Sequence, residues 1–96
     1  MTPLVWTRRA IHDVQAIQQF IARDSPQAAQ LVTQQLVAVV DRLPLFPHAG
    51  RVVPETADPH IREVIHGSYR IVYRLIHEEI HILTVHHAAR LFHLEL

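Results

Sequence analysis

The sequence predicts an α+β domain in which a helical hairpin packs on one face of a small antiparallel sheet. Two observations support this prediction. Apolar residues recur at helical spacing in two consecutive segments between residues 8 and 43, and three short runs rich in Ile, Val and Tyr follow between residues 61 and 87. The expected order is β-α-α-β-β-β, in a single domain that spans residues 1–96.

The first strand and the first helix are expected at residues 3–7 and 8–22. A Leu-Val-Trp run forms the strand, and Thr7 belongs to a residue type that caps helices. Apolar residues at helical spacing follow, namely Ala10, Ile11, Val14, Ile17 and Ile21. Because an Arg-Asp pair interrupts this pattern after Ala22, the helix should end there.

The second helix is expected to begin at Pro26. Ser25 is a favoured N-cap residue, and a proline at the first helical position already has the required backbone angle. A wide apolar stripe follows, formed by Ala28, Ala29, Val32, Leu36, Val39, Val40 and Leu43. Pro44 should end the helix, because proline lacks the N–H that a helix interior needs. The two helices should then form an antiparallel hairpin over the sheet.

The remaining strands follow a loop at residues 45–60, in which residues 51–53 are a candidate edge strand. Apolar runs at residues 61–65, 69–76 and 80–85 are separated by His-Gly-Ser and His-Glu-Glu turns. Runs of this length, joined by a few turn residues, are typical of an antiparallel three-strand meander.

The middle strand of this meander, residues 69–76, has two different faces. One face is apolar and consists of Tyr69, Ile71, Tyr73 and Leu75. The other face combines two arginines with aliphatic residues, in the order Arg70, Val72, Arg74 and Ile76. Charges on a central strand need either solvent or an anionic partner, so this face is the candidate functional surface.

Composition excludes several classes of protein. Cysteine is absent, which excludes a disulfide scaffold and a thiolate metal site. The formal net charge is zero and all nine basic residues are arginines, which argues against a protein that holds nucleic acid mainly by its overall field. No apolar run reaches 18 residues and no cleavable leader follows Met1, so a soluble cytoplasmic protein without a membrane partner is expected.

One short motif suggests a metal site. His77, Glu78 and His81 match the HExxH pattern of zinc proteases. That pattern binds zinc on a helix, where the two histidines share one face. Because it spans a predicted turn between strands here, we interpret it as a chance match, and we expect neither a metal nor another cofactor.

An ordered set of short matches runs through nearly the whole chain. In its first part the set comprises Trp6, Ala10, Ile17, Ile21, Ser25, Pro26, Ala28 and Ala29. In its second part it comprises Pro47, Gly50, Arg51, Glu55, Ile61-Arg62-Glu63, the run from Tyr69 to Arg74, Ile82, Leu83, Val85, His87 and Arg90. Together with the β-α-α-β-β-β order, this set resembles the RelE/ParE superfamily of toxins from bacterial type II toxin–antitoxin systems. The resemblance implies a small toxin that a cognate antitoxin neutralises, with a hetero-oligomer of the two as a further expectation.

The resemblance leaves two toxin activities open. RelE-like members cut mRNA in the ribosome, and for them Arg62 and Arg70 would hold the scissile phosphate, Glu55 would be the base and His86 or His87 the acid. ParE-like members act on DNA gyrase and need no catalytic residue. For them the target- or antitoxin-binding candidates are the arginines Arg51, Arg62, Arg70, Arg74 and Arg90.

We favour the ParE-like interpretation. An aromatic residue often ends the last strand of RelE-like members, whereas this chain has His-His-Ala-Ala there, and it lacks the lysines on which some of them rely. The alternatives are a ribosome-dependent mRNA endonuclease and an inactive relative that only binds an antitoxin. The arginines also have a purely structural interpretation, in which they pair with Glu55, Glu63 or Asp58 and hold the sheet together.

Overall fold

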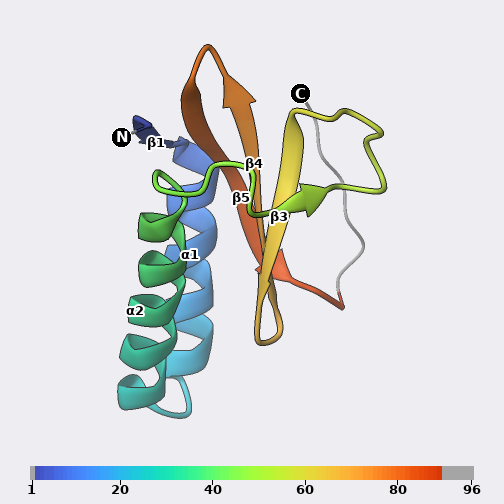
Figure 1. The fold of residues 1–96 in the computed structure, drawn as a ribbon. Coiled ribbons are helices and arrows are strands. Elements are labelled where there is room, and N and C mark those ends of the chain that lie inside the picture. Colours follow the sequence, from blue (N-terminus) through green and yellow to red (C-terminus); the bar gives the residue numbers. More distant parts are fainter. Residues whose placement is uncertain (1, 90–96) are drawn as a thin grey trace.

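The computed structural model describes residues 2–89, which form two helices on one face of a five-stranded sheet (Figure 1). This arrangement confirms the predicted fold class. In chain order the elements are β1 (Leu4–Trp6), α1 (Arg8–Ala22), α2 (Pro26–Arg42), β2 (Arg51–Val52), β3 (Ile61–His66), β4 (Tyr69–Ile76) and β5 (Glu79–His87).

Both helices begin at the predicted caps. The Thr7 hydroxyl oxygen accepts a hydrogen bond from the Ala10 N–H at 3.2 Å, and the Ser25 hydroxyl oxygen accepts one from the Ala28 N–H at 3.1 Å. Each bond satisfies an N–H that has no partner within its helix. These local bonds explain why the starts of both helices were predictable from the sequence.

The strand order is β1-β5-β4-β3-β2, so β4 lies at the centre of the sheet as predicted. Four of the strands form an antiparallel arrangement, but β1 pairs parallel to β5, with Leu4 opposite Ile80 and Trp6 opposite Ile82. The sheet is therefore mixed. The sequence did not predict this pairing, because the two strands are more than 70 residues apart and a parallel pair has no turn motif to mark it.

The main core lies between the helices and the sheet. Ile71 and Tyr73 of β4 are fully buried there, and Leu75 packs at its margin, as predicted for the apolar face of this strand. The helices contribute Ala10, Val14, Leu36 and Val40. A smaller cluster on the opposite face joins Val53, Ile61 and Val72, with Leu83 packed against it.

Strand β5 contains a bulge. Val72 lies opposite Thr84 and the next residue, Tyr73, lies opposite Ile82, so Leu83 is an extra residue without a counterpart on β4. One extra residue reverses the alternation of side chains beyond it. Ile80 and Ile82 before the bulge and Val85 after it pack in the main core, so His86 falls on the other face, opposite Arg70.

No helix within residues 2–89 is both long and apolar enough to cross a membrane.

Candidate functional site

The candidate site lies on the face of the sheet away from the helices. We call this surface the arginine face and define it by Arg51, Glu63, Arg70 and His86. Its central residue is Arg70, whose side chain is only 10% exposed. Side chains along β4 alternate between the two faces of the sheet. Because Ile71 and Tyr73 point into the main core, Arg70 points to the opposite face.

Glu63 holds one side of the Arg70 guanidinium. The Arg70 Nε–H donates to Glu63 Oε2 at 2.8 Å, and Nη2 donates to Glu63 Oε1 at 2.9 Å. The Glu63 side chain is fully buried. A buried carboxylate is tolerated only when it is paired. Glu63 therefore needs Arg70 as its partner, and its two hydrogen bonds fix the orientation of the guanidinium.

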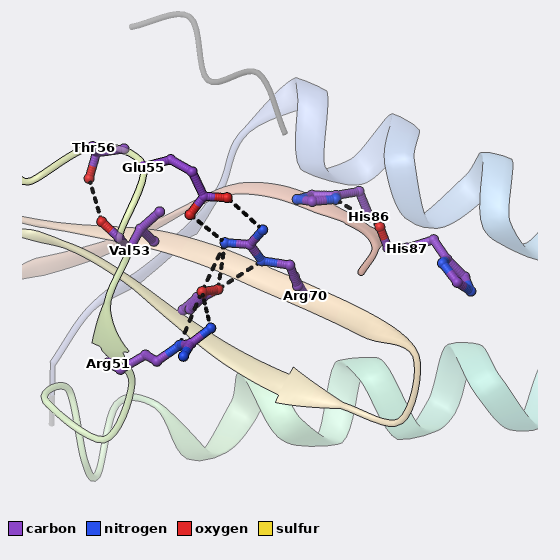
Figure 2. Close-up of polar contacts among 8 residues, drawn as sticks. Arg51, Val53, Glu55, Thr56, Arg70, His86 and His87 are labelled. Atoms are coloured by element: carbon purple, nitrogen blue, oxygen red, sulfur yellow. Dashed lines mark hydrogen bonds and ion pairs between the residues drawn. The ribbon is translucent and has the colours of Figure 1, made fainter. Parts of the chain in front are cut away.

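Glu55 holds the outer edge of the same guanidinium (Figure 2). Arg70 Nη1 donates to Glu55 Oε2 at 2.9 Å, and Nη2 donates to Glu55 Oε1 at 3.1 Å, which is a bidentate pair. The hydrogen bonds from Arg70 lower the pKa of Glu55 below its usual 4.5. The two carboxylates on Arg70 differ in solvent exposure, because the Glu55 side chain is 41% exposed whereas that of Glu63 is buried.

Arg51 and Arg62 contribute differently to the site. Arg51 on β2 pairs with Glu63, with its Nη2 3.2 Å from Glu63 Oε1. Within residues 2–89 no carboxylate pairs with Arg62, and its Nη1 donates to the Gly50 carbonyl oxygen at 2.9 Å. The structural interpretation of the arginines therefore applies to Arg51 and Arg70, whereas Arg62 stabilises the loop before β2.

That loop is also fixed by Tyr73. Its hydroxyl accepts a hydrogen bond from the Gly50 N–H at 2.9 Å and donates to the Pro47 carbonyl oxygen at 2.8 Å. Burial raises the pKa of Tyr73. A Cβ at Gly50 would lie 2.6 Å from the Glu63 carbonyl oxygen, so only glycine fits between the loop and β3. The loop in turn positions Arg51 beside Glu63.

His86 and His87, the two histidines at the end of β5, point to different faces. His86 lies directly opposite Arg70 in the register, and Figure 2 shows its ring on the side of Arg70 and Glu55. His87 is exposed, and its ring meets Tyr69 edge-on at 5.7 Å. The structure thus brings Glu55, Arg70 and His86 together but separates His87 from them.

Helix α1 holds the bulge that places His86. Asp13 Oδ2 accepts hydrogen bonds from the Thr84 hydroxyl and from the Val85 N–H, the latter at 3.1 Å. The Thr7 hydroxyl donates to the Ile82 carbonyl oxygen at 2.6 Å. Sequence reasoning did not identify Asp13. Its only signal was Thr84, a polar residue next to Leu83 and Val85 in the apolar-rich run of residues 80–85.

The other predicted residues lie away from this group. Arg74 is half-buried and lies further along β4 than Arg70, where it is opposite Ile61 on β3 and His81 on β5. Arg90 lies outside the described residues. His77 and Glu78 form the turn between β4 and β5, as expected for a chance HExxH match. Within residues 2–89, no three side chains of His, Asp or Glu are placed to hold a metal ion together.

Comparison with known proteins decides the family. The profile described as the ParE toxin of the type II toxin–antitoxin system parDE matches residues 4–92. The chain belongs to the ParE toxin family. A curated relative of this ParE family member, Toxin RelE2 of Caulobacter vibrioides, is 38% identical over 92 residues, which cover 95% of the chain and all of the relative.

Solved structures agree with this assignment. The ParE family member described here superimposes on a chain of the chromosomal ParDE system from P. aeruginosa with a TM-score of 0.74 and 27% identity, over 91% of this chain and 96% of that one. The toxin–antitoxin complex RelBE2 from Mycobacterium tuberculosis gives a TM-score of 0.56 at 22% identity, over 90% of this chain and 96% of that one, which shows a shared fold.

Proposed function

We propose that this ParE family member inhibits DNA gyrase by binding it, without catalysis of its own, and that a cognate antitoxin neutralises it. The observation that supports this choice over RNA cleavage is the state of Arg70. Its guanidinium is held by a buried carboxylate on one side and by Glu55 on the outer edge. A scissile phosphate would have to displace Glu55 to reach it.

The lowered pKa of Glu55 also argues against a nuclease. General-base catalysis is most efficient when the pKa of the base lies near the working pH. Arg70 lowers the pKa of Glu55 below 4.5, so this carboxylate is a weak base at neutral pH. The formal net charge of zero adds to the argument, since a ribosome-dependent enzyme gains affinity from every phosphate that a basic surface neutralises.

The second candidate function is a RelE-like mRNA endonuclease. Two observations favour it: the relative at 38% identity carries the name Toxin RelE2, and Glu55, Arg70 and His86 lie on one face of the sheet. In this candidate His86 would be the acid, and His87, which points elsewhere, would have no part. The same residues thus decide between the two functions.

The discriminating experiment replaces Glu55, His86 and His87 by Ala together. We expect the purified triple variant to inhibit supercoiling by gyrase at least as strongly as the parent does, and neither protein to cut ribosome-bound mRNA. Removing an acid and a base from a nuclease would instead lower the cleavage rate by at least about 10²-fold. Far-UV circular dichroism and the unfolding midpoint establish that the variant is folded.

A matched control replaces one Glu and two His elsewhere. His48, His60 and Glu78 are exposed and lie away from the arginine face, so their joint replacement by Ala changes composition equally without touching the site. Cleavage of ribosome-bound mRNA by the parent and by this control, with none by the triple variant, would contradict the gyrase proposal and establish the endonuclease.

The antitoxin partner is tested by co-expression. The chain exposes large apolar residues on its helices, including Phe20 at 66% and Leu31 at 55%. We propose that the antitoxin covers these side chains, as partners do at exposed apolar patches. Expression alone should therefore arrest growth or give insoluble protein, and co-expression with the product of the neighbouring gene should relieve both. Normal growth and soluble protein without the neighbour would contradict this part of the proposal.

A further inference from the structure

We propose that the outer edge of Arg70 is a docking point for a carboxylate side chain of the protein target, and that Glu55 occupies this point as an internal, exchangeable substitute. This inference rests on the proposed function, because it assumes that the target is a protein. It adds the group on the target that binds, an Asp or Glu side chain, and the residue that this group displaces, Glu55.

The two carboxylates on Arg70 are held very differently. Glu63 is fully buried and is also paired with Arg51, so it is a permanent part of the site. Glu55 is 41% exposed and meets Arg70 from the loop after β2. Water reaches the Glu55 carboxylate and competes with Arg70 for it, which weakens the net contribution of this pair, whereas Glu63 is shielded from water. Glu55 is therefore the partner that can exchange.

The loop does not have to move when Glu55 leaves. The Thr56 N–H and hydroxyl both bond the Val53 carbonyl oxygen at 3.2 Å, and Val53 is anchored in the smaller core cluster. The Asp58 N–H donates to the Thr56 hydroxyl at 3.3 Å. Because the backbone is held by these bonds, a rotation of the Glu55 side chain is enough to open the edge of Arg70.

Charge and shape both indicate a carboxylate as the incoming group. Among these contacts within residues 2–89, removal of Glu55 leaves two arginines, Arg51 and Arg70, facing the single carboxylate of Glu63, so another carboxylate can replace the lost negative charge. The distances of 2.9 and 3.1 Å to Glu55 show that the edge accepts a planar carboxylate in bidentate fashion. The zero net charge of the chain adds no long-range attraction for the many phosphates of an RNA.

The test uses Glu55→Gln, which keeps the shape of the side chain and removes its charge. The probe is sodium acetate, and the readout is the NMR resonance of the Arg70 Nε–H in the full chain. We expect acetate to shift this resonance saturably. The dissociation constant of acetate should be at least about tenfold lower for Glu55→Gln than for the parent. Glu78→Gln, which removes one exposed carboxylate from the distant turn, should behave as the parent.

Inorganic phosphate at matched ionic strength is the competing probe. Tighter binding of phosphate than of acetate to Glu55→Gln would overturn the proposal in favour of a nucleic-acid phosphate. An unchanged Arg70 resonance with either probe, in Glu55→Gln and in the shorter Glu55→Asp, would overturn it altogether. Unfolding midpoints near that of the parent establish that these variants are folded.

Gyrase then separates this inference from the proposed function. If the parent inhibits gyrase, Glu55→Gln should inhibit it at a several-fold lower concentration and Glu78→Gln should not differ from the parent. Equal or weaker inhibition by Glu55→Gln would overturn the inference while the gyrase function stands. If the parent does not inhibit gyrase at all, the proposed function fails, and the acetate titration still decides whether Arg70 accepts a carboxylate.

Discussion

Asp13 on helix α1 accepts a hydrogen bond from the hydroxyl of Thr84, which is buried at the bulge of strand β5. The same carboxylate oxygen accepts one from the Val85 N–H. A bulge leaves backbone groups without their ladder partners, and here the helix supplies an acceptor for one of them. Through this contact, helix α1 stabilises the bulge, beyond which His86 lies opposite Arg70.

Replacing Asp13 by Ala should therefore destabilise the fold. The Thr84 hydroxyl and the Val85 N–H would be left without an acceptor in a buried place, which costs about 1–3 kcal/mol in the free energy of unfolding. Urea denaturation measures this loss. Asp41→Ala, at an exposed position of α2, is the control and should change the free energy of unfolding by less than about 0.5 kcal/mol. Equal effects of the two substitutions would show that the Asp13 contact is not stabilising.

Gly50→Ala should destabilise the protein more than Gly67→Ala. A Cβ at Gly50 would lie 2.6 Å from the Glu63 carbonyl oxygen and 2.7 Å from the Tyr73 hydroxyl oxygen. Overpacking of this kind costs about 1–3 kcal/mol or more. Gly67 has a φ of +57° and open space around it, so Ala there meets only backbone strain of about 1 kcal/mol. Thermal unfolding of the two variants tests the order, and a greater loss at Gly67 would refute it.

The two carboxylates on Arg70 should differ in their contribution to stability. Glu63→Ala leaves buried arginine charge without its buried partner and should cost about 3–5 kcal/mol. Glu55→Ala removes an exposed partner and should cost no more than about 1 kcal/mol. Chemical denaturation of both variants checks the comparison. A Glu55 variant as unstable as the Glu63 variant would argue that Glu55 is not exchangeable.

The ion pair between Glu55 and Arg70 should weaken in acid. Hydrogen bonds from Arg70 lower the pKa of Glu55 in the folded state below its ordinary value of 4.5. A group of this kind stabilises the fold above its unfolded-state pKa, and the contribution is lost as the pH falls through the lower, folded-state pKa. The parent should therefore exceed Glu55→Gln in stability at neutral pH, and this difference should shrink below pH 4.5. Denaturation curves of the two proteins at neutral pH and at about pH 3 provide the comparison. A difference that persists unchanged in acid would mean that the Glu55 charge does not contribute.

The residues of the candidate site were easier to predict than their arrangement. Alternation along β4 placed Arg70 on the face away from the helices, and the resemblance to the RelE/ParE superfamily pointed to Glu55, Arg62 and either His86 or His87. Alternation alone did not reveal that Arg62 donates a hydrogen bond to the Gly50 carbonyl oxygen. The partner of a long side chain depends on which loop lies above it, and periodicity carries no information about that loop.

The sequence by itself determined the two helices, their caps at Thr7 and Ser25, and the three-strand meander. These features depend on residues within a few positions of one another, so apolar spacing and turn residues specify them. Only the tertiary structure decided that β1 pairs parallel to β5 and that the bulge at Leu83 turns His86 toward Arg70. Both are set by contacts between the two ends of the chain, such as Asp13 with Thr84 across 71 residues, and they exist only once the helices have packed on the sheet.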